Sequence, residues 1–361
     1  MKFIPDIVNF ALSFFTAFIV TYVSIPTIVK VARTKHLFDE PDERSSHTRK
    51  TPTLGGLAIF GGFVISTGLC INIAEIPEFQ YVIPALIIVF FIGIKDDILI
   101  IAPITKFAGQ IAASLVIVVI GGIRITNFHG FFGINEVNYL VSVAVTLLTI
   151  LVIINGFNFI DGVDGLSASI GIITSSTFVV FFLIAGKIQL VIVALALIGA
   201  LSAFFWFNVY GKRNKIFMGD TGSLIIGLIL SLLVIAFNQY NIDKTRSYAI
   251  YPAPTVSFGI LIIPLFDLLR VMFIRIIIKR PLLKPDKNHL HHQLLELGLK
   301  HKQVTLIISV VNIFFILFVF YTATFISIRR QLLLILLLAI GLSYIPPYLI
   351  SRKKKKQVLH L

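Results

Sequence analysis

The sequence predicts an all-α polytopic membrane protein with about ten to eleven transmembrane helices. Two observations on composition carry this. Of the 361 residues, 57% are hydrophobic and 13% are charged, which is about half the charge of an ordinary soluble domain. The mean hydropathy is +0.97. Because a soluble protein cannot hide that much apolar surface, a cytosolic enzyme, a secreted disulfide scaffold and a disordered chain are excluded.

The third observation is the arrangement of the apolar residues along the chain. A helix needs about 20 such residues to cross the hydrocarbon core of a bilayer. Eleven segments are expected to do so: residues 7–29, 53–74, 81–94, 107–123, 139–154, 168–185, 189–209, 222–238, 251–274, 304–326 and 331–350. The third and fourth are short, and we expect them to extend into the loop between them.

Lysine and arginine predict the orientation of these helices. With the N-terminus outside, 23 of the 31 basic residues fall in the inner segments, which are residues 30–52, 95–106, 155–167, 210–221, 275–303 and 351–361. Cytoplasmic loops carry such an excess, and the basic tail 351–361 places the C-terminus inside. The net charge of +14 therefore fits anionic lipids. We expect no nucleic acid as a partner, because the basic residues are dispersed among apolar segments.

The aspartates gather in the same inner segments. Asp96 and Asp97 directly follow an apolar run, and Asp161 and Asp164 lie in segment 155–167, which contains no lysine or arginine. Acids near bilayer depth without basic partners are costly and usually functional. A divalent cation is the simplest partner for several carboxylates, and the oxygen-rich residue types favour Mg²⁺ or Mn²⁺.

Two conformations are open for the segment that contains Asn155, Asn158, Asp161 and Asp164. Their spacing of three residues would place them on one face of a helix. The glycines at 156, 162 and 165 favour an irregular loop over at least part of it. A pair of Asx turns with a helix N-cap is the purely structural alternative.

Asp220 precedes another apolar segment and has glycines at 219 and 222. Free backbone amides at a helix start would suit a phosphate. Alternatively, Asp220 is only the N-cap of that helix.

The longest inner loop, residues 275–303, contains three histidines in four residues, His289, His291 and His292. Imidazoles there could contact a sugar or a phosphate, and Arg275 could pair with a pyrophosphate. A zinc site and a solvated loop are the alternatives. The polar segment from Arg44 to Gly56 could bind phosphate or simply fix sidedness.

Together these motifs resemble the polyprenyl-phosphate N-acetylhexosamine-1-phosphate transferases, the family that includes the WecA, TagO and MraY enzymes of bacteria. The resemblance runs in order along nearly the whole chain. It rests on Arg44 to Gly56, Asp96-Asp97, Lys106-Phe107 with Gln110, Asn155 to Ser167, Met218-Gly219-Asp220 with Gly222-Ser223, and His289-x-His291-His292. Leu290 interrupts the histidines, as in the WecA and TagO branch.

The resemblance implies a role for each residue. Asn158 and Asp220 are expected as ligands of Mg²⁺, or of Mn²⁺. Asp96, Asp97 and Lys106 are expected to be catalytic. The substrate-binding set is then Asn155, Asp161, Asp164, Arg275, His289, His291 and His292.

The resemblance also implies the reaction. N-acetylhexosamine-1-phosphate, most simply GlcNAc-1-phosphate, passes from a UDP-N-acetylhexosamine to undecaprenyl phosphate, and UMP is released. The expected setting is the bacterial cytoplasmic membrane, with the active site facing the cytoplasm. This would be the first membrane step of an envelope glycan such as O-antigen or teichoic acid.

We expect a single transferase domain over residues 1–361, with 275–303 as its sugar-recognition loop. A homodimer is compatible with the sequence, although no motif demonstrates one. The main rival is a proton-coupled transporter, since it too would use intramembrane acids. Clustering of the acids at one membrane face favours the transferase.

Overall fold

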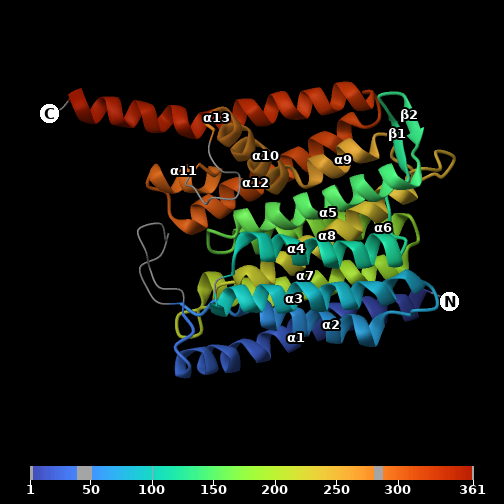
Figure 1. Cartoon of the computed structure of the whole chain (residues 1–361), viewed down its shortest axis with the longest axis horizontal. Helices are drawn as coiled ribbons and strands as arrows, with labels where there is room; N and C mark the ends of the chain where they lie inside the picture. The colour runs from blue at the N-terminus through green and yellow to red at the C-terminus, as the bar shows by residue number, and fades with distance from the viewer. Residues whose placement is uncertain (1–2, 39–50, 100, 280–287, 360–361) are drawn as a thin grey trace.

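Long helices lie side by side through most of the computed structural model, which describes residues 3–38, 51–99, 101–279 and 288–359 (Figure 1). The helices are α1 (Phe3–Thr34), α2 (Gly55–Cys70), α3 (Val82–Leu99), α4 (Pro103–Leu115), α5 (Tyr139–Ile160), α6 (Leu166–Ile184), α7 (Ile188–Tyr210), α8 (Gly219–Tyr240), α9 (Ala253–Ile260), α10 (Ile262–Ile277), α11 (Leu290–Glu296), α12 (His301–Thr322) and α13 (Ile328–Leu359). A 3₁₀ turn spans Pro77–Tyr81, and a π-helical turn over Val116–Ile120 extends α4. The strands β1 (Asn127–Phe131) and β2 (Ile134–Glu136) form one antiparallel hairpin.

Eight of the described helices are long and apolar enough to cross a membrane, which confirms the all-α polytopic membrane class. The expected count of ten to eleven exceeds eight because three segments fail on length or charge. Helix α2 has only 16 residues, and α3 ends in the charged run Lys95 to Asp97. The third is the expected helix 251–274.

That segment is not one helix, and here the prediction was wrong. It divides into α9 and α10 at Leu261. Pro264 has no N–H to donate to the carbonyl oxygen of Ile260, which interrupts the hydrogen-bond ladder of a continuous helix. The side-chain amide of Asn312, on α12, donates to that carbonyl at 3.4 Å instead.

Helix α8 forms the centre of the bundle. Nearly every residue from Thr221 to Asn238 is buried, as expected for a helix that is apolar on all sides. It packs between α3 and α5 and also against α2. A Cβ atom on Gly56 of α2 would lie 2.2 Å from the backbone nitrogen of Gly222. The Gly-Gly that opens α2 therefore serves close helix packing.

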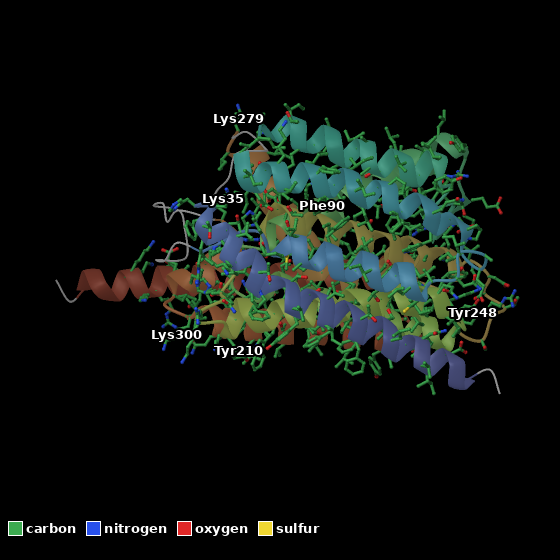
Figure 2. All side chains as sticks on the ribbon, turned by 90° about the horizontal axis from the view of Figure 1, so that it is seen from below. Lys35, Phe90, Tyr210, Tyr248, Lys279 and Lys300 are labelled. Atoms are coloured by element: carbon green, nitrogen blue, oxygen red, sulfur yellow. The ribbon has the colours of Figure 1, made fainter. Side chains whose placement is uncertain are left out.

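Basic residues of the predicted inner segments gather at one end of the bundle. Lys35, Lys279 and Lys300 lie at this end, and Tyr248 lies at the other (Figure 2). We call it the basic end. The C-terminal part of α13 extends from the basic end, while the N-terminus lies at the opposite end (Figure 1). The ends of α3 and α5 and the starts of α4 and α8 meet there.

Candidate active site

Lys106 is the centre of a polar cluster at the basic end. Its ammonium nitrogen lies 2.7 Å from Asp220 Oδ1, 3.1 Å from Asp96 Oδ2 and 3.4 Å from Asn158 Oδ1. These four side chains come from four different helices, α4, α8, α3 and α5. The structure therefore brings together residues that the sequence separates by more than a hundred positions.

The turn between α3 and α4 positions two members of the cluster. Asp96 lies on the last turns of α3, and its Oδ1 accepts a hydrogen bond from the backbone N–H of Ile101 at 2.8 Å. Pro103 then begins α4, since its fixed φ suits the first helical position. Lys106 consequently lies in the first turn of α4, facing Asp96.

Asp97 has a different environment from its neighbour. Its carboxylate accepts hydrogen bonds from the backbone N–H of Asp220 at 2.6 Å and from both the N–H and the hydroxyl of Thr221, at 3.1 and 2.6 Å. It therefore caps the N-terminus of α8, as an acidic side chain at a helix start does. Gly219, with φ of +72°, allows this approach, because a Cβ there would lie 2.6 Å from the Asp97 carboxylate.

This cap argues against both interpretations of the start of α8. Since the backbone N–H groups of Asp220 and Thr221 donate to Asp97, they are not free for a phosphate, and Asp220 is not the N-cap of its own helix. Its side chain instead turns toward Lys106 and Asn158. The side-chain amide of Asn158 donates to Asp220 Oδ1, and also to Ser223 Oγ at 2.9 Å.

Helix α5 runs unbroken through Asn155 and Asn158 to Ile160, so the helical alternative holds for these two residues. The irregular part is confined to the turn 161–165. One turn before Asn158, the Asn155 amide donates to Gln110 Oε1 at 2.7 Å. Asn155 thus ties α5 to α4 beside the cluster.

The donor set of the cluster fits a hard cation. Two carboxylates and one amide oxygen already surround the positive nitrogen of Lys106. Within the described residues, no group of three or more His, Cys, Asp and Glu side chains is placed to hold a metal. Mg²⁺ typically uses only one or two carboxylates together with substrate phosphates. The carboxylate and amide oxygens present are therefore ligand types that suit Mg²⁺.

Asp161 and Asp164 follow α5 in the turn but differ in charge environment. Burial raises the pKa of Asp161 well above its usual value, and the negative charges of Asp220, Asp97 and Asp164 raise it further. The charges of the carboxylates near Lys106 therefore influence Asp161.

Asp164 contacts basic partners. Its Oδ2 lies 2.6 Å from Lys215 Nζ and 3.3 Å from His301 Nδ1. Burial alone would raise the pKa of Asp164, but the bonds to His301 and Lys215 outweigh it and lower that pKa. Asp164 thereby joins the turn to α12 and to the segment before α8. No motif in the sequence predicts this bond.

The histidines form a second cluster next to the first. His289 Nδ1 lies 2.8 Å from Asp267 Oδ2, and its ring stacks on Phe159 with centroids 5.1 Å apart. His291 is buried beside Gly162, where a Cβ would lie 2.8 Å from His291 Nε2. Burial lowers the pKa of His291 to about 3, so its ring is neutral. The ring of His292 lies 4.2 Å from that of His291.

Two residues of this second cluster, Asp267 and Arg270, were not predicted from the sequence. Asp267 Oδ1 accepts from the backbone N–H of Leu290 at 3.1 Å, and Arg270 Nη2 donates to the same oxygen at 3.0 Å. Arg270 also donates to the carbonyl of Asn288. The available signal was a pair of opposite charges three residues apart in an apolar segment. Arg275, buried at the end of α10, lies 6.0 Å from the ring centre of Phe159.

Phe159 and Gly162 connect the two clusters, because both belong to the end of α5 and its turn.

Some predicted positions fall outside the described residues, namely Arg44 to Lys50 and the run from Arg280 to Lys287. All the residues expected to be catalytic, metal-binding or substrate-binding are among those described.

Comparison with known proteins identifies the family. The pattern of glycosyl transferase family 4 matches residues 79–238. A probable undecaprenyl-phosphate N-acetylglucosaminyl 1-phosphate transferase of Bacillus subtilis (strain 168) is 31% identical over 316 residues, covering 87% of this chain and 84% of the relative. The chain belongs to glycosyl transferase family 4. The resemblance expected from the motifs is thereby confirmed.

Other relatives of this transferase family agree. A decaprenyl-phosphate N-acetylglucosaminephosphotransferase of Mycobacterium tuberculosis (strain ATCC 25618 / H37Rv) is 32% identical, over 81% of this chain and 77% of its own length. An undecaprenyl-phosphate alpha-N-acetylglucosaminyl 1-phosphate transferase of Escherichia coli (strain K12) is 26% identical, over 78% and 75%. The family pattern at 79–238 contains the whole Lys106 cluster, whereas the histidine cluster lies beyond it.

Proposed function

We propose that this protein transfers GlcNAc-1-phosphate from UDP-GlcNAc to a membrane polyprenyl phosphate, at a site on the cytoplasmic side of the bilayer. The observation that carries the proposal is the convergence of Asp96, Lys106, Asn158 and Asp220 at the basic end. The relatives named above act on undecaprenyl or decaprenyl phosphate. The product would begin the synthesis of a cell-envelope glycan.

The reaction joins two anions. An oxygen of the lipid phosphate attacks the sugar-linked phosphorus of UDP-GlcNAc, and the bond from that phosphorus to the bridging oxygen of UMP breaks. Because the two phosphate groups repel each other, catalysis depends on positive charge and alignment. The ammonium of Lys106 provides one such charge at the centre of the cluster.

Asp220 and Asn158 would hold Mg²⁺, or Mn²⁺, with Asp96 beside them. When bound, the ion neutralises pyrophosphate charge and stabilises the departing UMP. The ammonium of Lys106 lies between the carboxylates of Asp96 and Asp220 and offsets part of their negative charge.

The adjacent residues Asp96 and Asp97 have different roles. Asp96 faces Lys106 and would orient the lipid phosphate or accept its last proton. A general base is needed only for the lipid phosphate monoanion, since the phosphate dianion is already nucleophilic. Asp97 is engaged by three donors of α8, so we assign it to positioning Asp220.

The acceptor lipid needs a path from the bilayer. An apolar cavity of about 500 Å³ lies between α5, α8, α9, α10 and the hairpin. Its lining includes Val152, one helical turn before Asn155, and Leu269, which is next to Arg270 in the sequence. The first isoprene units of the acceptor would lie there, while the histidine cluster contacts the sugar.

A reconstituted assay tests the proposal. The full chain in detergent is given undecaprenyl phosphate and a panel of UDP-sugars, and UMP is measured with Mg²⁺, with Mn²⁺ and with EDTA. We expect UMP release with UDP-GlcNAc, dependence on the lipid phosphate, and loss with EDTA. Solute uptake by vesicles without UMP release would instead support the transporter.

A further inference from the structure

The C-terminal part of α13 presents two opposite faces at the basic end. The helix has 32 residues, a length of about 48 Å at 1.5 Å per residue. Since the hydrocarbon core is only about 30 Å thick, the residues near Arg352 reach the headgroup layer or beyond it. The run Arg352 to Lys355 is exposed.

One face holds α11. Lys354 Nζ lies 2.9 Å from Glu296 Oε1, and Lys353 Nζ donates to the carbonyl of Leu297 at 3.3 Å. Both contacts are at the C-terminal end of α11, where cations satisfy the last carbonyls and the negative end of the helix dipole. The N-terminal half of the same short helix carries His291 and His292.

The other face carries a stripe of residues that point away from α11. At 100° per residue, the midpoint of Arg352 and Lys355 lies opposite the midpoint of Lys353 and Lys354. Tyr344 and Tyr348 continue this stripe toward the membrane, with rings stacked 6.4 Å apart. The guanidinium of Arg352 lies 5.8 Å from the ring centre of Tyr348. Tyrosines beside basic residues are typical of the membrane–water interface.

We propose that the stripe Tyr344, Tyr348, Arg352 and Lys355 binds the phosphate headgroup of an anionic phospholipid of the inner leaflet. Its charge and its place along α13 match such a headgroup. The same turn of α13 contacts α11 through Lys353 and Lys354. A bound headgroup therefore stabilises the position of α11 and its histidines against the turn after α5. Anionic lipid thereby strengthens binding of the UDP-sugar. This part rests on the function proposed above.

The test compares nanodiscs of phosphatidylcholine with nanodiscs that also contain phosphatidylglycerol. For the wild-type chain, phosphatidylglycerol should lower the KM for UDP-GlcNAc about threefold and leave kcat unchanged. The double variant Arg352→Gln, Lys355→Gln should lose this lipid effect while keeping the KM measured in phosphatidylcholine alone. Lys35→Gln, Lys212→Gln removes the same charge from exposed positions at the basic end and should respond as the wild type does.

Native mass spectrometry gives a readout that does not depend on activity. The wild-type protein and the Lys35/Lys212 control should retain phosphatidylglycerol, and the Arg352/Lys355 variant should lose it. Equal retention, or an equal lipid effect in both double variants, would overturn the proposal, as would a full effect of inorganic phosphate in detergent. Absence of UMP in every arm, with normal lipid retention, would refute the proposed function and leave the lipid site standing.

Discussion

At the scale of single residues, the central feature is the contact of Lys106 Nζ with the carboxylates of Asp96 and Asp220. Asp220 provides the shortest contact of Lys106, at 2.7 Å, and replacing its carboxylate with an amide removes one negative charge from the cluster. We expect Asp220→Asn to lower kcat by roughly 100-fold, the loss typical when one preorganised electrostatic group is removed. UMP release measures this. Asp243→Asn, an exposed site in the loop after α8, is the control. Near wild-type turnover in Asp220→Asn would contradict the metal assignment.

The two neighbouring aspartates permit a matched comparison. Asp97→Ala removes the cap of α8, so we expect it to destabilise the fold by about 1 kcal/mol, the usual effect of a lost N-cap, and to lower activity. Asp96→Ala removes a carboxylate that faces Lys106 and should lower activity with a smaller change in stability. Thermal unfolding in detergent separates the two. Equal losses of stability would show that the division of roles is incorrect.

At the scale of elements, α11 depends on a neutral buried histidine. The pKa of His291 in the fold is about 3 because of burial, whereas an exposed histidine has a pKa of about 6.5. Protonation therefore favours the unfolded chain. The contribution of His291 to stability is complete above pH 6.5 and declines as the pH falls from 6.5 toward 3.

His291→Gln should remove this dependence. Between pH 6.5 and pH 5, we expect the wild-type protein to lose up to about 2 kcal/mol of stability that the variant does not lose. Melting temperatures of both proteins at pH 7 and pH 5 give the comparison. Parallel melting curves would show that His291 is already hydrated in the fold.

At the scale of the whole molecule, the apolar cavity between α5, α8, α9, α10 and the hairpin is the proposed place of the acceptor lipid. Val145→Trp would fill part of its lining on α5. We expect the KM for undecaprenyl phosphate to rise about tenfold, as for a loss of ~1.4 kcal/mol of binding, without a change in the KM for UDP-GlcNAc. Leu140→Trp, on the exposed surface of the same helix, should leave both unchanged. A rise in the KM for the nucleotide alone would place the lipid elsewhere.

Much of this architecture was predictable from the sequence, because length, hydropathy and charge bias determine which segments can cross a membrane. The acids of the cluster were also found, since carboxylates beside apolar runs are conspicuous. The difference between Asp96 and Asp97 was not predictable. Adjacent residues on a helix point about 100° apart, and only the position of α8 decides which one caps it.

The break between α9 and α10 and the Asp267–Arg270 pair escaped prediction for a related reason. Pro264 permits either a kink or a break, and the choice depends on Asn312, which is distant in sequence. The partners of Asp267 are likewise on a segment about twenty residues later. Side chains show what bonds they can form, whereas packing decides which ones they do form.

The bond from Asp97 to α8 has a consequence for biosynthesis. Its acceptor and donors are separated by 123 residues, which a ribosome adds in about 6–25 s at 5–20 residues per second. During that interval the nascent chain already contains Asp97, while the amides that will donate to its carboxylate do not yet exist. A chain that stops before Gly219 would therefore hold Asp96, Asp97 and Lys106 in the membrane without an assembled catalytic centre.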